Sequence, residues 1–187
     1  MTRKVAVVVG SIRKESINRK LAKALVKLAP KDFECDFVKI DDLPVFNQDH
    51  DQNPPESVLR VKGQVMASNA FLFITPEHNR SLPTALKNVL DWVSRPYGKN
   101  LWAGKPAGLA GASLGAVGTA VVQAHLRSVL GYLDVPMGRG YCVAMAEIDF
   151  GDVLTLRRNS PAEKIGERIG TTLIRDRIYI DVDALFK

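Results

Sequence analysis

The sequence predicts an α/β protein with a doubly wound, five-stranded parallel sheet and helices on both faces. Five short apolar segments alternate with helical segments along 187 residues, without an internal repeat or a linker. The first segment, Val5–Val9, is apolar at every position, which is typical of strands buried on both faces of a parallel sheet. Strict alternation of strands and helices is the pattern of a doubly wound fold. We therefore expect a single α/β domain over residues 1–187.

The elements of the first half follow from apolar spacing and turn residues. Gly10 turns the chain off the first strand, and leucines recur at helical spacing from Leu21 onward, so a helix begins near Ser16 or Ile17. The next expected elements are a strand at Phe33–Ile40, a long surface loop at Asp41–Pro55, a helix at Glu56–Ser68 and a buried strand at Ala70–Thr75.

The second half continues the alternation. Pro83 stands in the first turn of a third helix, where proline is tolerated. The later expected elements are a turn-rich segment at Arg95–Pro106, a small-residue strand at Ala107–Ala112, a helix around Ala116–Leu133 and a strand at Tyr141–Met145. Beyond Gly151 we expect only a helix from about Ala162.

The composition, with 46% hydrophobic and 25% charged residues, is that of a soluble globular protein. No apolar run approaches the roughly 20 residues of a membrane helix, and Val5–Val9 is too short for the apolar core of a signal peptide. Cys35 and Cys142 lie far apart in apolar, strand-like segments, which favours buried thiols over a disulfide or a metal site. We therefore expect a cytoplasmic protein without a membrane segment.

The formal charge of +6 raises the question of a nucleic-acid partner. The basic residues are scattered, and no basic block alternates with aromatic residues, so we expect no nucleic-acid binding. The excess charge favours small anionic ligands instead. The run Asp49-His50-Asp51 is best interpreted as part of a solvated loop, because no second cluster offers further metal ligands.

The loop after the first strand carries the clearest functional signal. Ser11, Arg13, Ser16 and Asn18 bring two hydroxyls, a guanidinium and an amide to the start of a helix. Free backbone N–H groups and the positive end of the helix dipole favour an anion there. A plain turn capped by Ser16 would need only one polar residue. The convergence of four favours phosphate binding.

The glycine content of this loop indicates the kind of phosphate. A dinucleotide fingerprint needs three glycines and a nucleotide-triphosphate P-loop needs a second glycine followed by Lys-Ser/Thr, whereas this loop has only Gly10. Side chains must therefore provide most of the contacts to the phosphate, which suits a terminal monophosphate.

Two further loops are expected at the same edge of the sheet. The segment that follows Thr75 contains Pro76 and Pro83, with a run of backbone N–H donors between them that could bind a planar heterocycle. The segment Gly111–Gly118 is a second small-residue turn from strand to helix.

Taken together, these loops resemble the NAD(P)H-dependent FMN reductase family, a flavodoxin-like group that includes quinone, azo and chromate reductases. The motifs that carry the resemblance are GSIRKESIN, TPEHNRSLPTALKNVLDW, and GASLGAVG followed by Gln123, His125 and Arg127. The resemblance runs from about Val5 to Pro136 and implies a flavodoxin-like fold.

The resemblance also implies site residues. The FMN phosphate would be held by Ser11, Arg13, Ser16, Ile17 and Asn18. The isoalloxazine ring would be received by Pro76, Glu77, His78 and Asn79, and covered by Ala112, Ser113 and Gly115. This sequence departs from the family's pattern at two positions. His78 stands where the family usually has a tyrosine, and Thr84 stands where it usually has a glycine. Histidine can change charge near neutral pH, so His78 is a candidate modulator rather than a catalytic residue.

The implied activity is a hydride transfer from NAD(P)H to bound FMN, followed by two-electron reduction of a quinone, free flavin, azo compound or metal oxyanion in ping-pong order. No side chain is needed as nucleophile or base. The resemblance also implies a homodimer or homotetramer.

Three other functions match parts of the sequence. A flavodoxin-type electron carrier remains the alternative, although such carriers have acidic surfaces and Thr/Gly-rich phosphate loops. A hydrolase is suggested by the G-x-S-x-G pattern around Ser113, but the only later histidine, His125, is too close in sequence. A receiver domain would need acidic residues where Gly10 and Thr75 stand.

Overall fold

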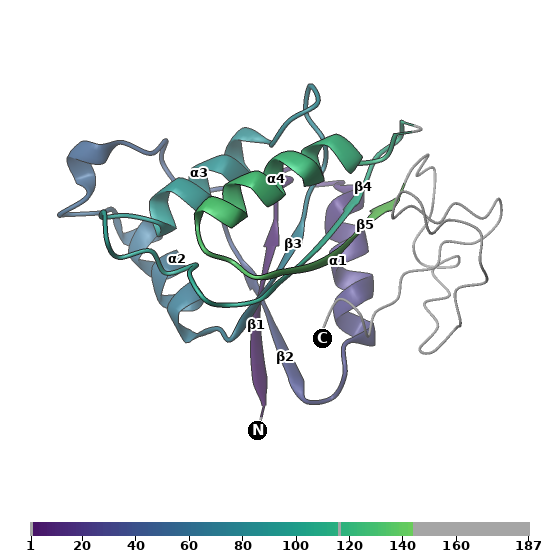
Figure 1. Ribbon diagram of the computed structural model, residues 1–187, viewed down its shortest axis with the longest axis horizontal. Helices are drawn as coiled ribbons and strands as arrows, with labels where there is room; N and C mark the ends of the chain where they lie inside the picture. Colours follow the sequence, from purple (N-terminus) through teal and green to yellow (C-terminus); the bar gives the residue numbers. More distant parts are fainter. Residues whose placement is uncertain (1, 116, 144–187) are drawn as a thin grey trace.

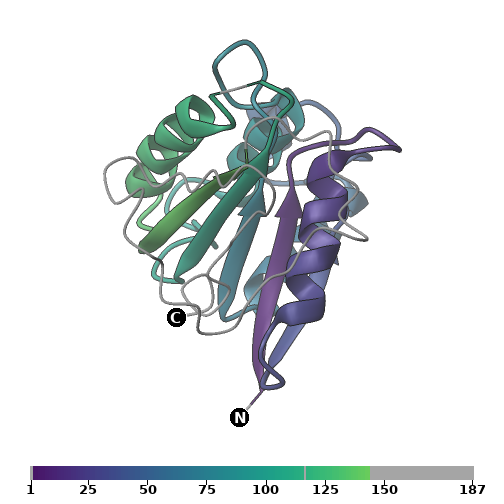
Figure 2. The ribbon, with the colours of Figure 1, turned by 90° about the vertical axis from the view of Figure 1, so that its right-hand side faces the viewer.

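A computed structural model, which describes residues 2–115 and 117–143, contains a five-stranded parallel sheet with the strand order β2-β1-β3-β4-β5 (Figure 1). Helices cover both faces of the sheet, as predicted (Figure 2). The strands are β1 (Arg3–Val9), β2 (Phe33–Val38), β3 (Ala70–Ile74), β4 (Ala107–Ala112) and β5 (Met137–Val143). The helices are α1 (Ile17–Leu28), α2 (Glu56–Ala67), α3 (Thr84–Val93) and α4 (Ala120–Tyr132), with a short 3₁₀ turn at Gln48–His50.

The two faces of the sheet hold separate apolar clusters, because successive strand residues point to opposite sides. Val5, Val7 and Val9 of β1 pack with Leu21 and Leu25 of α1. The alternate β1 residues pack in the cluster under α2, α3 and α4. Within the described residues, α1 therefore covers one face while the other three helices cover the opposite face (Figure 1).

The strand β2 differs from the central strands because it forms one edge of the sheet. Its residues alternate between half-buried and exposed, and only Val38 is fully buried. Cys35 is therefore half-buried rather than deeply buried, and this burial raises the pKa of its thiol. The strand ends at Val38, two residues before the predicted end.

The long segment that contains Asp41–Pro55 is exposed, as expected, but it is anchored to α3. The indole N–H of Trp92 donates to the Pro44 carbonyl at 2.8 Å. The Asn88 amide donates to that carbonyl at 2.8 Å and accepts from the Phe46 N–H at 2.7 Å.

The last described helix and strand differ from the predicted boundaries. We expected a helix from about Ala116, but α4 begins at Ala120 because the chain first turns at Gly118, whose φ is +66°. We expected a strand from Tyr141, but β5 begins at Met137, which pairs with Ala107 of β4. Residue 116, the last two residues of the predicted fifth strand and the predicted helix from Ala162 lie outside the described residues. No helix in the described ranges has the length and apolar character needed to cross a membrane.

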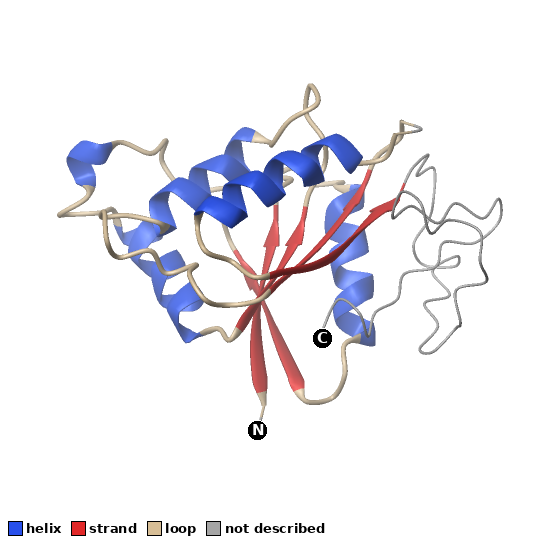
Figure 3. Cartoon of the chain, viewed as in Figure 1, coloured by secondary structure: helices blue, strands red, loops and turns tan. Residues whose placement is uncertain are grey.

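All five strands are parallel, so their carboxyl ends meet at one edge of the sheet (Figure 3). The Gly10 N–H donates to the Ile74 carbonyl at 2.8 Å, and the Thr75 N–H donates to the Ala110 carbonyl at 3.0 Å. These bonds hold the ends of β1, β3 and β4 at the same level. The loops that follow these three strands therefore start side by side.

Gly111 occupies the tightest glycine position of this edge. A Cβ atom there would collide with the Thr75 carbonyl oxygen and the Thr119 hydroxyl, and would lie 2.9 Å from Thr119 Cβ. We expect Gly111→Ala to lower the free energy of unfolding by about 1–3 kcal/mol or more, because backbone cannot yield as a flexible side chain does. Urea unfolding measures the loss.

Gly63, in the middle of α2, is the matched control because a Cβ atom added there would meet no other atom within 4 Å. Gly63→Ala should raise stability by about 0.5–1 kcal/mol through the better helix propensity of alanine. Equal effects of the two substitutions would contradict the close approach at Gly111.

Candidate functional site

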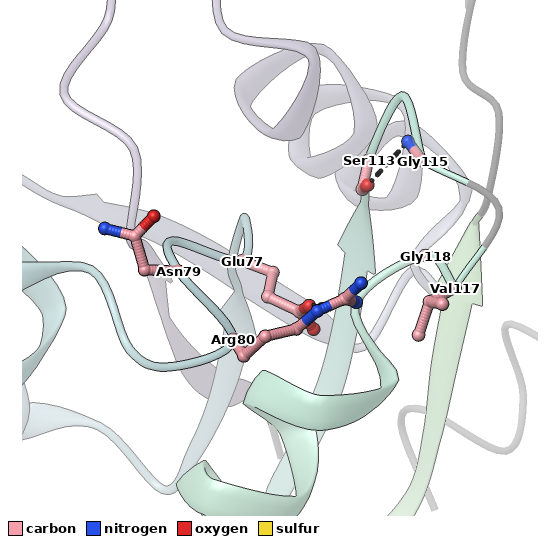
Figure 4. Close-up of a pocket in the computed structure, with 7 residues that line it drawn as sticks. All are labelled: Glu77, Asn79, Arg80, Ser113, Gly115, Val117 and Gly118. Carbon is pink, nitrogen blue, oxygen red and sulfur yellow. Dashed lines mark hydrogen bonds and ion pairs between the residues drawn. The ribbon is translucent and has the colours of Figure 1, made fainter.

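A cavity of about 480 Å³ opens at the carboxyl edge of the sheet, between the β3–α3 loop and the β4–α4 loop (Figure 4). In sheets of this strand order, ligands bind beyond the carboxyl ends of the strands at the switch point between β1 and β3, and this cavity lies beside that point, between the loops after β3 and β4. The residues that line the cavity are Glu77, Asn79, Arg80, Ser113, Gly115, Val117 and Gly118. Four of them are sequence-predicted site residues: Glu77, Asn79, Ser113 and Gly115.

The β1–α1 loop keeps the features of an anion cradle. The backbone N–H groups of residues 12–15 have no hydrogen-bond acceptor among the described residues. Ser11 is buried at the base of the loop, whereas Arg13 is exposed. Ser16 is the N-cap of α1, and its hydroxyl accepts the Arg19 N–H at 3.2 Å. Ser16 is thus a helix cap, and Ser11, Arg13 and the free amides stay predicted phosphate ligands.

Asn18, a predicted phosphate ligand, also has a partner within the protein. It is 1% exposed, and its amide donates to the Ala112 carbonyl at 2.8 Å and accepts the Ala112 N–H at 2.9 Å. These reciprocal bonds join the first turn of α1 to the end of β4. Asn18 thus fixes the β1–α1 loop against the β4–α4 loop, and Ile17 beside it is half-buried against the core on the α1 side.

The β3–α3 loop contains a tight hairpin. The His78 N–H donates to the Ser81 carbonyl at 3.1 Å, and the Ser81 N–H donates to the His78 carbonyl at 2.8 Å. The two residues between them, Asn79 and Arg80, have φ values of +48° and +63°, as in a type I′ turn. We expected a run of unpaired donors here, but the hairpin uses two of them. Of this stretch, the N–H groups of residues 77, 79, 80 and 82 have no acceptor among the described residues.

Glu77 connects this hairpin to α4. Its side chain is 7% exposed, one carboxylate oxygen accepts the Val122 N–H at 3.1 Å, and the other accepts from the Arg80 guanidinium at 3.0 Å. Thr119, the N-cap residue of α4, makes no side-chain capping bond. Glu77 therefore takes the place of a cap, where the helix dipole favours a negative charge.

The β4–α4 loop is held by its own small residues. The Ser113 hydroxyl accepts the Gly115 N–H at 3.0 Å, and Ala112 is buried at the end of β4. The Nδ1 atom of His125 lies 3.2 Å from the Ser81 hydroxyl, so this histidine contacts the hairpin and not Ser113. Among the described residues, the serine of the G-x-S-x-G pattern, Ser113, therefore lacks the histidine partner that a hydrolase of this type would need.

The remaining predicted residues border the cavity less closely. Pro76 is half-buried, while His78 is exposed and is not one of the cavity-lining residues. Thr84, which replaces the family's usual glycine, is exposed at the start of α3 and does not line the cavity either. Sequence reasoning missed Arg80, Val117 and Gly118. Only the positive φ of Arg80 and the path of the β4–α4 loop reveal them.

Comparisons with known proteins identify relatives of this chain. The model of the NADPH-dependent FMN reductase family matches residues 3–149. A 2-hydroxy-1,4-benzoquinone reductase from a Burkholderia species is 52% identical over 135 residues, which cover 72% of this chain and 74% of that protein. A quinone reductase from Pseudomonas putida is 46% identical, covering 81% of this chain and 80% of the relative.

A solved structure gives the same result. The flavoenzyme FerB, an NAD(P)H:acceptor oxidoreductase from Paracoccus denitrificans, superposes with a TM-score of 0.70 at 48% identity. The superposition covers 73% of this chain and 75% of FerB.

The bonds between Asn18 and Ala112 give a direct test of how the site is held together. Asn18→Ala should lower the free energy of unfolding by about 2–4 kcal/mol, because two buried backbone groups of Ala112 lose their partners. Asn69→Ala is the control, since Asn69 is exposed and accepts a single bond, from the Lys4 N–H at 2.8 Å. It should cost about 1 kcal/mol or less. Chemical denaturation of both variants gives the comparison, and similar losses would argue against the Asn18 link.

Proposed function

We propose that this chain, which belongs to the NADPH-dependent FMN reductase family, is a quinone reductase that holds FMN at the carboxyl edge of its sheet. The protein is an NAD(P)H-dependent FMN oxidoreductase with a flavodoxin-like fold. The observation that carries the quinone assignment is the 46–52% identity to enzymes named for quinone reduction. The same identities favour an enzyme over a flavodoxin-type electron carrier.

The chemistry belongs to the cofactor. Bound FMN supplies it, because an isoalloxazine ring accepts a hydride from a nicotinamide and returns two electrons to an acceptor. In the net reaction, a quinone, NAD(P)H and one proton give a hydroquinone and NAD(P)⁺.

The β1–α1 loop fits the phosphate of FMN. Four amide groups without acceptors, at residues 12–15, surround the amino end of α1 and could donate to phosphate oxygens. The buried Ser11 hydroxyl and the exposed Arg13 guanidinium add side-chain donors. Ser16, Ile17 and Asn18 hold the shape of this loop through the helix cap, the core contact and the link to Ala112.

The hairpin and the β4–α4 loop fit the ring of FMN. The amides of residues 77, 79 and 80 lack acceptors and could donate to the polar edge of a heterocycle. Fixed N–H dipoles of this kind stabilise the negative charge of a reduced ring without reorganisation. Pro76, His78 and Asn79 would lie along one side of the ring, with Ala112, Ser113 and Gly115 along the other.

NAD(P)H and the quinone would both have to reach the ring through the cavity at the carboxyl edge, so we propose that they bind in turn and react in ping-pong order. Free flavins, azo compounds and metal oxyanions are further acceptors within the proposal. We also propose a homodimer or homotetramer in the cytoplasm. Two apolar side chains of the β4–α4 loop support a partner chain, since Leu114 and Val117 are 68% and 45% exposed.

Steady-state kinetics test the proposed function. The purified protein with FMN should oxidise NAD(P)H when 1,4-benzoquinone is added, and double-reciprocal plots at several quinone concentrations should be parallel. Stoichiometric formation of hydroquinone, followed by chromatography, is the second readout. Intersecting lines would exclude the ping-pong order. Absence of turnover would favour the electron carrier.

Arg13→Ala tests the phosphate assignment. A charge-assisted bond to phosphate contributes about 1.5–3 kcal/mol, so FMN affinity should fall about tenfold to a hundredfold. Titration of the apoprotein by flavin fluorescence measures the dissociation constant. Riboflavin, which lacks the phosphate, should bind wild type and Arg13→Ala equally weakly.

Lys14→Ala is the control, because Lys14 is an exposed cation next to Arg13 in the same loop. It should change FMN affinity much less than Arg13→Ala does. An unchanged FMN dissociation constant in Arg13→Ala would refute the role of Arg13.

A further inference from the structure

Arg80 occupies an unusual backbone position at the cavity. It is the second central residue of the hairpin turn, with φ at +63°, where a glycine would fit without steric cost. Its neighbour Asn79 is a residue type that tolerates this conformation, whereas arginine is not. Strained residues persist where the surrounding structure holds them, and they concentrate at functional sites. The side chain of Arg80 is therefore a candidate ligand-binding group.

The two charged side chains that line the cavity differ in their exposure to solvent. Glu77 is 7% exposed and Arg80 is 65% exposed, with 3.0 Å between their paired atoms. Figure 4 shows the two side chains running together toward the β4–α4 loop. Both oxygens of the Glu77 carboxylate already accept hydrogen bonds, one from Arg80 and the other from the Val122 N–H at the start of α4. No other acidic residue of the described ranges lines the cavity. A ligand entering from solvent thus meets a cation.

The FMN phosphate does not account for this cation. In the proposed function that phosphate lies in the β1–α1 loop, and no residue of this loop lines the cavity. Arg80 instead lines the cavity in which the ring is proposed to lie, and NAD(P)H and the acceptor would both have to reach the ring there. One of its terminal nitrogens binds Glu77, and the others remain for a planar anion that a guanidinium can hold with two bonds.

We propose that Arg80 is a specificity-determining residue that selects quinones bearing an ionised hydroxyl next to a ring carbonyl. Such a group is a vinylogous carboxylate, because its charge is shared between two oxygens across the ring carbons. This inference rests on the proposed quinone reductase function. In the reaction, the hydroxyquinone anion, NAD(P)H and two protons give the neutral benzenetriol and NAD(P)⁺, and Arg80 itself is unchanged.

The test compares 2-hydroxy-1,4-benzoquinone with 2-methoxy-1,4-benzoquinone, which carries its oxygen at the same position but cannot ionise. For each enzyme, the ratio of kcat/KM for the hydroxyquinone to kcat/KM for the methoxyquinone is measured near neutral pH. Comparing this ratio between enzymes cancels the difference in reactivity between the two quinones. Arg80→Gln removes the charge and keeps much of the length, while Arg80→Lys keeps the charge.

We expect the ratio to fall about threefold to tenfold in Arg80→Gln, which is the effect of a charge-assisted bond reduced for partial exposure to water. Arg80→Lys should retain part of the preference. Lys27→Gln, with the same loss of charge, should leave the ratio unchanged, because Lys27 lies in the last turn of α1, at the opposite edge of the sheet. Thermal unfolding and FMN affinity of each variant show whether the hairpin is intact.

Three outcomes would overturn the assignment. An unchanged ratio in Arg80→Gln, with normal turnover of both quinones, would overturn the role of Arg80 alone. A change in the NADPH-to-NADH preference without a change in the quinone ratio would assign Arg80 to the 2′-phosphate of the coenzyme. Absence of turnover with both quinones and with 1,4-benzoquinone in wild type would remove the proposed function and this inference together.

Discussion

The site depends on the reciprocal hydrogen bonds between the Asn18 side chain and the backbone of Ala112. These bonds, at 2.8 and 2.9 Å, join residues 94 positions apart and are fully enclosed by protein. Buried amides that satisfy both backbone groups of a partner are costly to break, because neither group can turn to water. The loop proposed for the phosphate and the loop proposed for the ring therefore keep a fixed relation. A ligand that contacts both loops would find them already positioned.

Glu77 performs the corresponding task on the other side of the cavity. Its carboxylate holds the hairpin to the amino end of α4, where a capping side chain is otherwise lacking. The same carboxylate also positions Arg80, so one buried anion serves a helix end and an exposed cation. Removing it would leave the Val122 N–H and the guanidinium without their common partner. Packing, capping and electrostatics at this site are thus coupled through a single residue.

This arrangement suits an enzyme whose cofactor carries the reaction. Apart from the ion pair of Glu77 and Arg80, the described cavity-lining residues contain no pair of side chains that could act as general acid and base, and His125 lies 3.2 Å from the Ser81 hydroxyl. What they offer instead is hydrogen-bonded loops, amides without acceptors and the exposed cation of Arg80. These features position ligands and stabilise charge, which is the part that protein contributes to flavin chemistry. Specificity can then reside in exposed residues such as Arg80 while the support beneath them stays constant.

The sequence by itself determined the sheet, its helices and the loops that form the site. Apolar periodicity and turn residues act over a few positions, so Val5–Val9, the helix start at Ser16–Ile17 and the small-residue strand at Ala107–Ala112 could be predicted from local pattern. The motifs in three loops indicated the family, which the comparisons confirm. The helix that begins at Ala120 and the strand that begins at Met137 were misplaced, since Gly118 and the pairing with Ala107 set those boundaries.

Only the tertiary structure decided what the polar residues do. Asn18 meets Ala112, Glu77 meets Val122, and Ser81 meets His125 across 94, 45 and 44 positions of sequence, respectively. No local pattern encodes such partners, because they follow from the way parallel strands bring their carboxyl ends to one edge. The conformation of Arg80 is likewise imposed by the hairpin between His78 and Ser81 and not by its own preference. The sequence therefore placed the donors at the site, and the fold assigned each of them to a neighbour or to a ligand.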